Sequence, residues 1–275
     1  MASKAAPVVK WAGGKTRLLP ELLKRVPRTY GRYFEPFAGG AALFFHLAPA
    51  HGVLSDTNSD LIATYVAVRD DVELLIRKLR RHARLHDKQH YYTTRFRWNE
   101  GRARAEIDRA ASFIYLNKTC FNGLWRVNRD GAFNVPMGRY AAPAICKPVV
   151  LRAAHEALAR TELHCHDYRA ASTHAERGDF IYFDPPYDPI TKSASFTSYT
   201  AAAFGADQQR ELAETASALA ARGVRVMLSN SDTRFIRSLY RNFTIDRVKC
   251  SRAINSNAAR RGKVNELIIT GGLRS

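Results

Sequence analysis

One short stretch, residues 180–187, constrains the fold of this chain more than any other. Four apolar or aromatic residues, Phe180–Phe183, predict a strand buried on both faces, and the two prolines that follow predict an abrupt end to it. Asp184 is therefore expected at the carboxyl end of a strand, which is the edge where ligands bind in open α/β sheets. The stretch favours an α/β protein.

The tetrapeptide from Asp184 to Tyr187 combines a carboxylate, rigid carbonyls and an aromatic ring. The exocyclic amine of a nucleobase is a poor nucleophile because its lone pair is delocalised into the ring. The Asp184 carboxylate and the Pro185 carbonyl can accept both amine hydrogens and favour the pyramidal nitrogen that attacks an electrophilic methyl group. Tyr187 can stack on a base that has been flipped out of a duplex. For the tetrapeptide alone, an ordinary surface turn is an almost equally good interpretation.

Composition points to a polyanionic partner. Among 275 residues, Lys plus Arg number 43 against 25 for Asp plus Glu, which gives a net charge of +18. Charge alone does not separate DNA from RNA or from an anionic membrane surface. Because there is no apolar run of about 18 residues and no signal-peptide pattern, we expect a soluble cytoplasmic protein without a membrane partner. The cysteines are widely spaced and the histidines lack a ligand cluster, so neither a disulfide framework nor a metal is expected.

Two glycine turns near the start of the chain favour a cofactor site. Gly14-Lys15-Thr16 resembles the end of a P-loop, but Val9 stands where that motif requires a further glycine. The turn can instead bring backbone close to a ligand, with Trp11 and Lys15 supplying a ring and a cation. A turn without a ligand is the alternative.

The second turn, at Gly39, connects a predicted strand to a predicted helix over residues 41–48. The next predicted strand, residues 53–55, ends at Asp56, a position from which an acidic side chain can accept hydrogen bonds from ribose hydroxyls. Asp56 could equally cap the following helix. The two turns in this order favour a cofactor of the adenosine type.

Residues 59–146 are helical and basic in character. Val72, Leu75, Ile76 and Leu79 share one face of a predicted helix. Glycines, asparagines and arginines then alternate with aromatic residues over 122–140, and Asp130-Gly131 predicts a hairpin turn. Such a ribbon can enter a DNA groove, where Arg126 would donate to a guanine edge. A hairpin that only stabilises the core is the alternative.

The last part of the chain alternates strands with helices. Asp167 and Tyr168 follow another predicted strand and could border an adenine ring, although a helix cap and a core tyrosine are nearly as good an interpretation. Residues 188–200 predict a mobile loop over the substrate and residues 252–263 a basic loop. Helices are predicted at 110–121, 147–159 and 207–221, and strands at 224–228, 243–248 and 267–270. The alternation predicts a doubly wound, mostly parallel sheet.

In its order of motifs, the chain resembles the Dam-type (D12 class, alpha group) DNA adenine-N6 methyltransferases, nearly from end to end. The resemblance rests on several motifs in family order: residues 10–15, 35–39, 56–62, 122–140, 184–187 and 229–232. It implies the fold of the S-adenosylmethionine-dependent methyltransferases, with a catalytic domain of residues 1–58 and 147–275. It also implies a mainly helical target-recognition domain with a β-hairpin, residues 59–146.

The resemblance further implies S-adenosylmethionine as methyl donor, with S-adenosylhomocysteine as product. The residues implied to bind it are Trp11, Lys15, Asp56 and Asp184, with Phe37, Gly39, Asp167 and Tyr168 lining its pocket. The residues implied to act on the target adenine are Asp184, Pro185 and Tyr187. The residues implied to contact DNA are Lys10, Phe121, Asn122, Leu124, Arg126, Pro136 and Tyr140. Phe121 stands where the family frequently has a tyrosine, which leaves the flanking-sequence preference open.

The expected function is therefore site-specific methylation of a flipped adenine in double-stranded DNA, in GATC, by an enzyme that is monomeric in solution. Two alternatives remain open from the sequence. A cytosine-N4 methyltransferase could use the same acceptors for a different amine, and a DNA-binding homologue could keep the fold without catalysis. RNA is a weaker alternative substrate that charge does not exclude.

Overall fold

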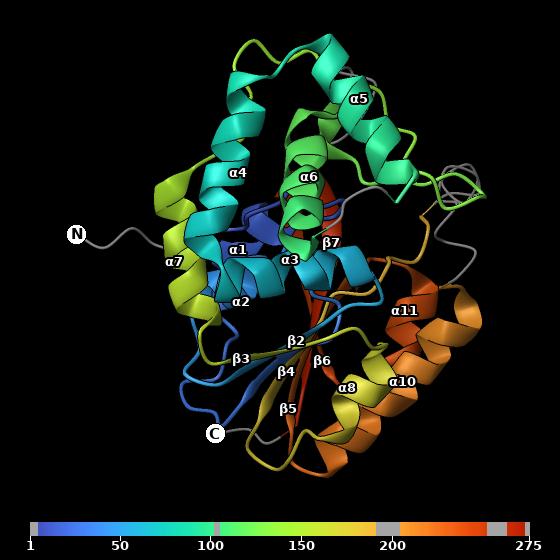
Figure 1. Ribbon diagram of the computed structural model, residues 1–275. Helices are drawn as coiled ribbons and strands as arrows, with labels where there is room; N and C mark the ends of the chain where they lie inside the picture. Colours follow the sequence, from blue (N-terminus) through green and yellow to red (C-terminus); the bar gives the residue numbers. More distant parts are fainter. Residues whose placement is uncertain (1–4, 102–104, 191–203, 252–262, 273–275) are drawn as a thin grey trace. The chain divides into compact units, whose positions relative to one another are not determined.

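The computed structural model describes residues 5–101, 105–190, 204–251 and 263–272 (Figure 1). The chain forms two compact units. The first comprises Met1–Thr16, Gly39–Gly52 and Asp56–Cys165, and the second comprises Arg17–Ala38, Val53–Ser55 and His166–Ser275. The predicted division into a catalytic and a target-recognition domain stays a prediction. Most of the predicted mobile loop and of the predicted basic loop lies outside the described residues.

A seven-stranded sheet confirms the predicted α/β class. Its strands are β1 (Tyr33–Glu35), β2 (Gly52–Ser55), β3 (Thr161–His164), β4 (Phe180–Phe183), β5 (Arg225–Ser231), β6 (Thr244–Ser251) and β7 (Lys263–Gly271). Their order in the sheet is β3-β2-β1-β4-β5-β7-β6. β4 pairs in parallel with β1 and β5, whereas β7 is antiparallel to β5 and β6, so the sheet is mostly parallel with an antiparallel edge.

Strand β4 has the burial that its sequence predicts, because each of its four side chains is at most 1% exposed. Ile181 and Phe183 share a core cluster with Val226 and Leu228 of β5, which are alternate residues and so point to one face of the sheet. Three helices pack against this cluster and lie together beside β4 and β5 in Figure 1. They are α8 (Tyr168–Thr173), α10 (Ala206–Ala221) and α11 (Arg234–Leu239); α1 (Leu19–Leu23) also belongs to this unit.

The first unit is mainly helical. Helix α6 (Glu106–Thr119) lies between α4 (Val72–Arg84) and α5 (Lys88–Asn99) in Figure 1, and it contacts α3 (Ser59–Asp70) as well. The four apolar residues predicted to share one face of α4 are all at most 8% exposed, which confirms that face. The unit also contains α2 (Ala42–Leu47) and α7 (Pro148–Leu158).

The predicted hairpin turn at Asp130-Gly131 is present, with the Asn128 N–H donating to the Ala132 carbonyl over 2.9 Å. Strand pairing around it is limited to the single antiparallel bridges Val127–Phe133 and Cys120–Met137. Regular strands do not form within residues 120–140 for two reasons. Proline has no N–H to donate to a neighbouring strand, and glycine loses more conformational entropy than other residues when its backbone is ordered.

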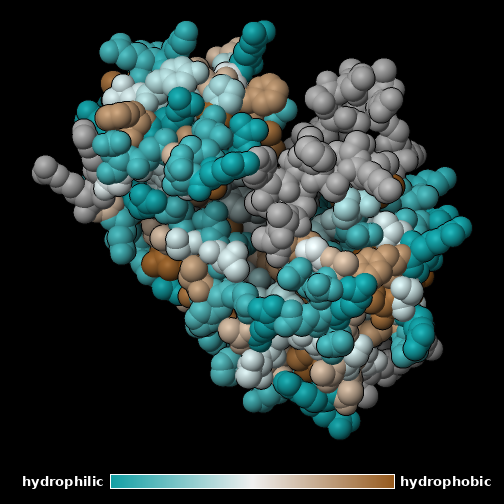
Figure 2. Space-filling model, turned by 90° about the vertical axis from the view of Figure 1, so that its right-hand side faces the viewer, coloured by the Kyte–Doolittle hydropathy of each residue, from teal (hydrophilic) through white to brown (hydrophobic). Residues whose placement is uncertain are grey.

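The surface agrees with a chain that carries many charged residues. Figure 2 shows a face covered mainly by hydrophilic residues, with hydrophobic ones in small scattered groups. In the described part of the chain, no helix is long and apolar enough to cross a membrane.

Candidate functional site

Asp184 directly follows β4 and is fixed from the neighbouring strand. The Ser229 hydroxyl on β5 donates to Asp184 Oδ1 over 2.9 Å, and the Tyr182 hydroxyl lies 2.8 Å from Ser229 Oγ. Because serine has one hydroxyl hydrogen, Tyr182 must be the donor in that second bond. Burial and the Asp184 carboxylate raise the pKa of Tyr182 well above its usual value, so its hydroxyl stays a donor. Two consecutive hydrogen bonds, from Tyr182 to Ser229 and from Ser229 to Asp184, thus orient the carboxylate.

The proline turn after Asp184 is tied to α10 and β5. The Gln209 side-chain amide donates to the Pro186 carbonyl over 2.8 Å, and Asn230 holds Gln209 in turn over 3.1 Å. Both amide residues are at most 1% exposed. Among the described residues, no backbone N–H donates a hydrogen bond to the Pro185 carbonyl, so the peptide backbone leaves this acceptor available beside Asp184.

Tyr187 ends the motif and is held by a residue of β7. Its hydroxyl donates to Glu266 Oε2 over 3.0 Å, and Glu266 is 7% exposed. Burial first, and then the nearby Asp184 carboxylate, raise the pKa of the Tyr187 phenol well above its usual value. The ring is therefore neutral and fixed at its hydroxyl end.

Three aromatic rings of the second unit form a small apolar wall. Phe37 stacks on Tyr168 with centroids 5.4 Å apart and an interplanar angle of 23°, and it meets Phe183 edge-on at 6.4 Å. Tyr168 is 4% exposed. It is thus a core tyrosine, as the alternative interpretation of the sequence stated, and its predicted role beside an adenine stays a prediction.

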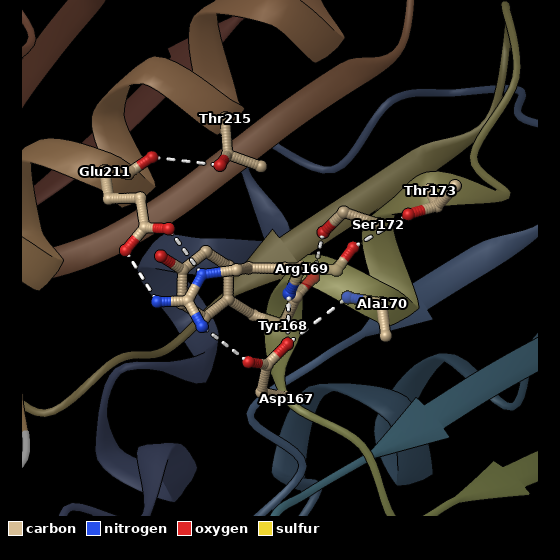
Figure 3. Close-up of polar contacts among 8 residues, drawn as sticks. All are labelled: Asp167, Tyr168, Arg169, Ala170, Ser172, Thr173, Glu211 and Thr215. Carbon is tan, nitrogen blue, oxygen red and sulfur yellow. Dashed lines mark hydrogen bonds and ion pairs between the residues drawn. The ribbon is translucent and has the colours of Figure 1, made fainter.

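Asp167 is the N-cap of α8. Its Oδ1 accepts from the Arg169 and Ala170 N–H groups over 2.9 and 3.3 Å. Figure 3 shows the Arg169 guanidinium between the carboxylates of Asp167 and Glu211, with bonds of 2.7 Å to Asp167 Oδ2 and 2.6 Å to Glu211 Oε2. Arg169 donates to both carboxylates and so fixes the orientation of Asp167 relative to Glu211.

In the first unit, Gly39 brings Trp11 and Asp56 together. The Gly39 N–H donates to Asp56 Oδ2 over 3.0 Å, and a Cβ added at Gly39 would lie 2.7 Å from Trp11 Cδ1. Gly39 also has a positive φ of 45°, so this position needs glycine for both reasons. The Tyr65 hydroxyl donates to the Gly39 carbonyl over 2.5 Å and fixes the turn from α3.

Asp56 is a half-buried carboxylate that can accept further hydrogen bonds. Its Oδ1 accepts from the Asn58 N–H over 2.9 Å, while Asn58 itself, and not Asp56, caps α3 through the Leu61 N–H. Burial raises the pKa of Asp56, and the backbone donors Gly39 and Asn58 oppose that rise. Since a carboxylate has about four acceptor sites, further donors such as ribose hydroxyls can still bind. This donor and acceptor set fits an adenosine-type cofactor.

Lys15 and Lys10 are both positioned by polar contacts. Lys15 is 8% exposed and its ammonium donates to the Gly13 carbonyl over 2.6 Å. The backbone of Lys10 exchanges two bonds of 2.7 Å with the Asn117 side chain on α6. The Lys10 ammonium lies 4.2 Å from the centre of the Tyr140 ring, a cation–π contact. Two predicted DNA-contacting residues are thus brought together.

The segment after α6 presents other predicted DNA contacts. Phe121 is 50% exposed, and its N–H donates to the Pro136 carbonyl over 2.8 Å. Asn122 has a φ of 55°, a left-handed conformation in a non-glycine residue, and such strain is found at ligand-binding segments. Leu124 is half-buried, and the exposed Arg126 donates to Asn134 over 2.9 Å.

Trp125 anchors this segment to the helices. Its ring lies 4.0 Å from that of Phe113 on α6 and 4.5 Å from that of Phe133, centre to centre. The ring is thereby held in an aromatic cluster while Arg126 and Phe121 stay exposed. The part of the chain that the structure describes has no group of three or more His, Cys, Asp or Glu side chains able to hold a metal ion.

The sequence placed the motif residues at the ends of strands but missed the residues that hold them. Gln209, Glu266 and Tyr65 were not singled out. Only Glu266 had a visible signal, a carboxylate that directly precedes the apolar strand residues 267–269. The predicted contacts of Trp11, Lys15, Gly39 and Asp56 in the first unit, and of Phe37, Asp167 and Tyr168 in the second, remain predictions about a cofactor.

The chain is similar to known DNA methyltransferases over nearly its whole length. A family model described as D12 class N6 adenine-specific DNA methyltransferase matches residues 11–254. The chain is 40% identical over 268 residues to the type II methyltransferase M1.LlaDCHI of Lactococcus lactis subsp. cremoris, covering 96% of this chain and 94% of that protein. It is 35% identical over 275 residues to the DNA adenine methylase of Haemophilus influenzae, with coverages of 98% and 95%. It is also 35% identical over 263 residues to that of Escherichia coli K12, with coverages of 94% and 93%.

Proposed function

The chain belongs to the D12 class of N6 adenine-specific DNA methyltransferases, and from this premise we propose that it methylates adenine within GATC in double-stranded DNA. The single observation that carries the chemistry is the Asp184 carboxylate, fixed by Ser229 at the carboxyl end of β4. Beside it stands the Pro185 carbonyl, and beyond it the Tyr187 ring.

In the proposed reaction, Asp184 and the Pro185 carbonyl each accept one hydrogen of the adenine N6 amine. This withdraws the nitrogen lone pair from the ring and directs it at the methyl group. When bound, S-adenosylmethionine supplies that methyl group on a sulfonium, a good leaving group. Asp184 can then take the surplus proton from the methylated nitrogen and pass it to water. Positioning of the amine carries much of the rate.

We propose that the residues predicted to bind the cofactor contact it, each through the side chain or backbone group described above. Asp56 would accept hydrogen bonds from ribose hydroxyls, and the Gly39 turn would let backbone approach the cofactor closely. Asp184 would also contact the amino acid part of the cofactor. The further residues in this part of the proposal are Trp11, Lys15, Phe37, Asp167 and Tyr168.

Base flipping is part of the proposal, because the N6 amine of a paired adenine is not accessible to Asp184 inside the duplex. The exposed Phe121 ring, with Asn122 beside it, is suited to fill the space left by the base. Arg126 and Lys10 would donate to guanine edges, while Leu124, Pro136 and Tyr140 would contact neighbouring bases. The net charge of +18 supports an anionic duplex as partner.

The experiment that tests this function measures transfer of a labelled methyl group to matched duplexes that contain GATC or the same bases scrambled. We expect label only on the GATC duplex, recovered as N6-methyladenine. Label on both duplexes would retain the enzyme class and discard the site. Recovery as N4-methylcytosine, or no transfer to any duplex by a protein that binds both S-adenosylmethionine and DNA, would contradict the proposal.

Recognition of the GATC guanine can be tested separately. We expect Arg126→Ala to relax discrimination at one base pair by about 1–3 kcal/mol, the usual value of a bidentate guanine contact. Single-base variants of the GATC duplex measure this, with Arg129→Ala, in the exposed turn of the same segment, as the matched control. An unchanged preference at every position would remove Arg126 from base recognition.

We also propose that the protein is a monomer in solution. Analytical ultracentrifugation would test this.

A further inference from the structure

Glu266 is a buried carboxylate that the proposed reaction does not yet use. It lies on β7 and is 7% exposed, and the next three residues, Leu267–Ile269, are fully buried. A carboxylate in such a position is costly unless it receives hydrogen bonds. Its Oε2 receives one from the Tyr187 hydroxyl over 3.0 Å.

The strand register explains why this contact forms. Phe183 of β4 pairs with Leu228 of β5, so Asp184 follows at the level of Ser229, with which it bonds. Ser231, two residues further along β5, pairs with Glu266 of β7. Glu266 therefore lies at the same edge of the sheet as Asp184, and the turn through Pro185 and Pro186 brings Tyr187 to it.

We propose that Glu266 is a positioning residue for methyl transfer, which holds the Tyr187 ring against the target base and enriches its electron density. This inference rests on the proposed function. During transfer, the N6 lone pair forms a bond to the methyl carbon while the bond from that carbon to sulfur breaks and its electron pair stays on sulfur. Positive charge moves from sulfur to nitrogen, and the proton that nitrogen then loses passes to Asp184 and water.

An electron-rich ring face stabilises a positive charge that develops beside it. A hydrogen bond from a neutral phenol to an ionised carboxylate is charge-assisted, and it shifts electron density into the ring. Burial, the Asp184 carboxylate, Tyr182 and Glu266 itself raise the pKa of Tyr187, so the phenol remains a donor at neutral and mildly alkaline pH. Glu266 would thus act on the transition state through Tyr187, without touching the substrate.

A purely structural role for Glu266 makes a different prediction. Loss of a strand contact would lower the melting temperature and weaken binding of cofactor and DNA together. Loss of the positioning role would slow the methyl-transfer step while both affinities stay the same. Separate measurements of binding and of single-turnover rate distinguish the two roles.

The test compares Glu266→Gln, Tyr187→Phe and the double variant in single-turnover methyl transfer to the GATC duplex, with enzyme and cofactor in excess. Glu266→Gln keeps the shape and an acceptor oxygen but removes the charge. We expect each single variant to slow transfer roughly 10- to 100-fold, as for the loss of one charge-assisted hydrogen bond. The double variant should be no slower than the slower single variant, because both remove the same interaction. Dissociation constants for S-adenosylmethionine and duplex should change less than about threefold.

Glu214→Gln, which removes an exposed carboxylate on α10, is the matched control and should transfer at the wild-type rate. A Glu266→Gln rate within about twofold of wild type, or multiplied losses in the double variant, would overturn the positioning role while the proposed function stands. Parallel losses of melting temperature and of both affinities would assign Glu266 to structure alone. Absence of transfer by the wild-type protein would overturn the proposed function, and this inference with it.

Discussion

Ser229 completes the catalytic motif although it lies 45 residues away in sequence from Asp184. It donates to the carboxylate and accepts from Tyr182, so one fully buried hydroxyl connects a core tyrosine to the proposed acceptor of the adenine amine. The position of Asp184 could be predicted because a buried strand and a proline turn are local signals. Ser229 belongs to a recognised motif, but its partner could not be predicted, since strand register decides which residue of β5 meets Asp184.

We expect Ser229→Ala to destabilise the protein and slow methyl transfer together. The substitution leaves the buried Tyr182 hydroxyl without this acceptor, which should lower the free energy of unfolding by about 1–3 kcal/mol. Urea unfolding followed by circular dichroism measures this. Ser217→Ala on the exposed face of α10 is the control and should change stability by no more than about 0.5 kcal/mol. Equal stability of the two variants would show that the Tyr182 bond contributes nothing.

At the scale of elements, a continuous apolar run predicted β4, and hydrophobic periodicity predicted the buried face of α4. It did not predict a layer of three histidines around Tyr115. The His82 ring stacks on Tyr115 with centroids 4.6 Å apart, and His82 Nδ1 lies 3.0 Å from His90 Nε2. His86 Nδ1 lies 3.0 Å from the Tyr115 hydroxyl. The layer joins α4, α5 and α6, and sequence periodicity cannot reveal it because the contacts come from three different elements.

This layer predicts a pH-dependent stability. Burial, and then His90, lower the pKa of His82 from 6.5 to about 4. The unfolded chain then binds a proton at a higher pH than the folded one, so stability is lost as pH falls from about 6.5 towards 4. From pH 7 to pH 5, His82 alone should remove up to about 2 kcal/mol.

Tryptophan fluorescence can follow this transition, because all three tryptophans belong to the first unit. Urea unfolding at pH 7 and pH 5 should show a smaller loss of stability for His82→Gln than for wild type. His51→Gln, an exposed residue just before β2, should behave as wild type. An identical pH dependence for all three proteins would contradict the half-buried, neutral state of His82.

At the scale of the whole molecule, the net charge predicted a polyanionic partner without distinguishing DNA from RNA or a membrane surface. The α/β class followed from alternating strands and helices, and the sheet confirms it. The polar partners that fix each motif residue could not be predicted, because they depend on register and on side-chain direction. The chain has 43 basic and 25 acidic residues. This imbalance implies that non-specific contact with phosphates supplies much of the affinity for DNA.

Binding to a scrambled duplex should therefore depend steeply on salt. If six to ten phosphates are contacted, affinity should fall roughly 10³- to 10⁵-fold between about 50 and 200 mM salt. Fluorescence anisotropy over that range gives the slope. Arg126→Ala should leave this slope within about one unit of wild type, because a base contact releases few counterions. A flat dependence would show that charge does not govern association.

The measurement that decides most directly whether Asp184 carries out methyl transfer compares the wild-type protein with Asp184→Ala on the GATC duplex. Duplex binding and labelled N6-methyladenine are measured on the same samples, and Asp207→Ala, an exposed carboxylate on α10, is the control. We expect Asp184→Ala to bind duplex with nearly unchanged affinity and to form no product, while the control remains active. Near-normal product formation by Asp184→Ala would contradict the mechanism.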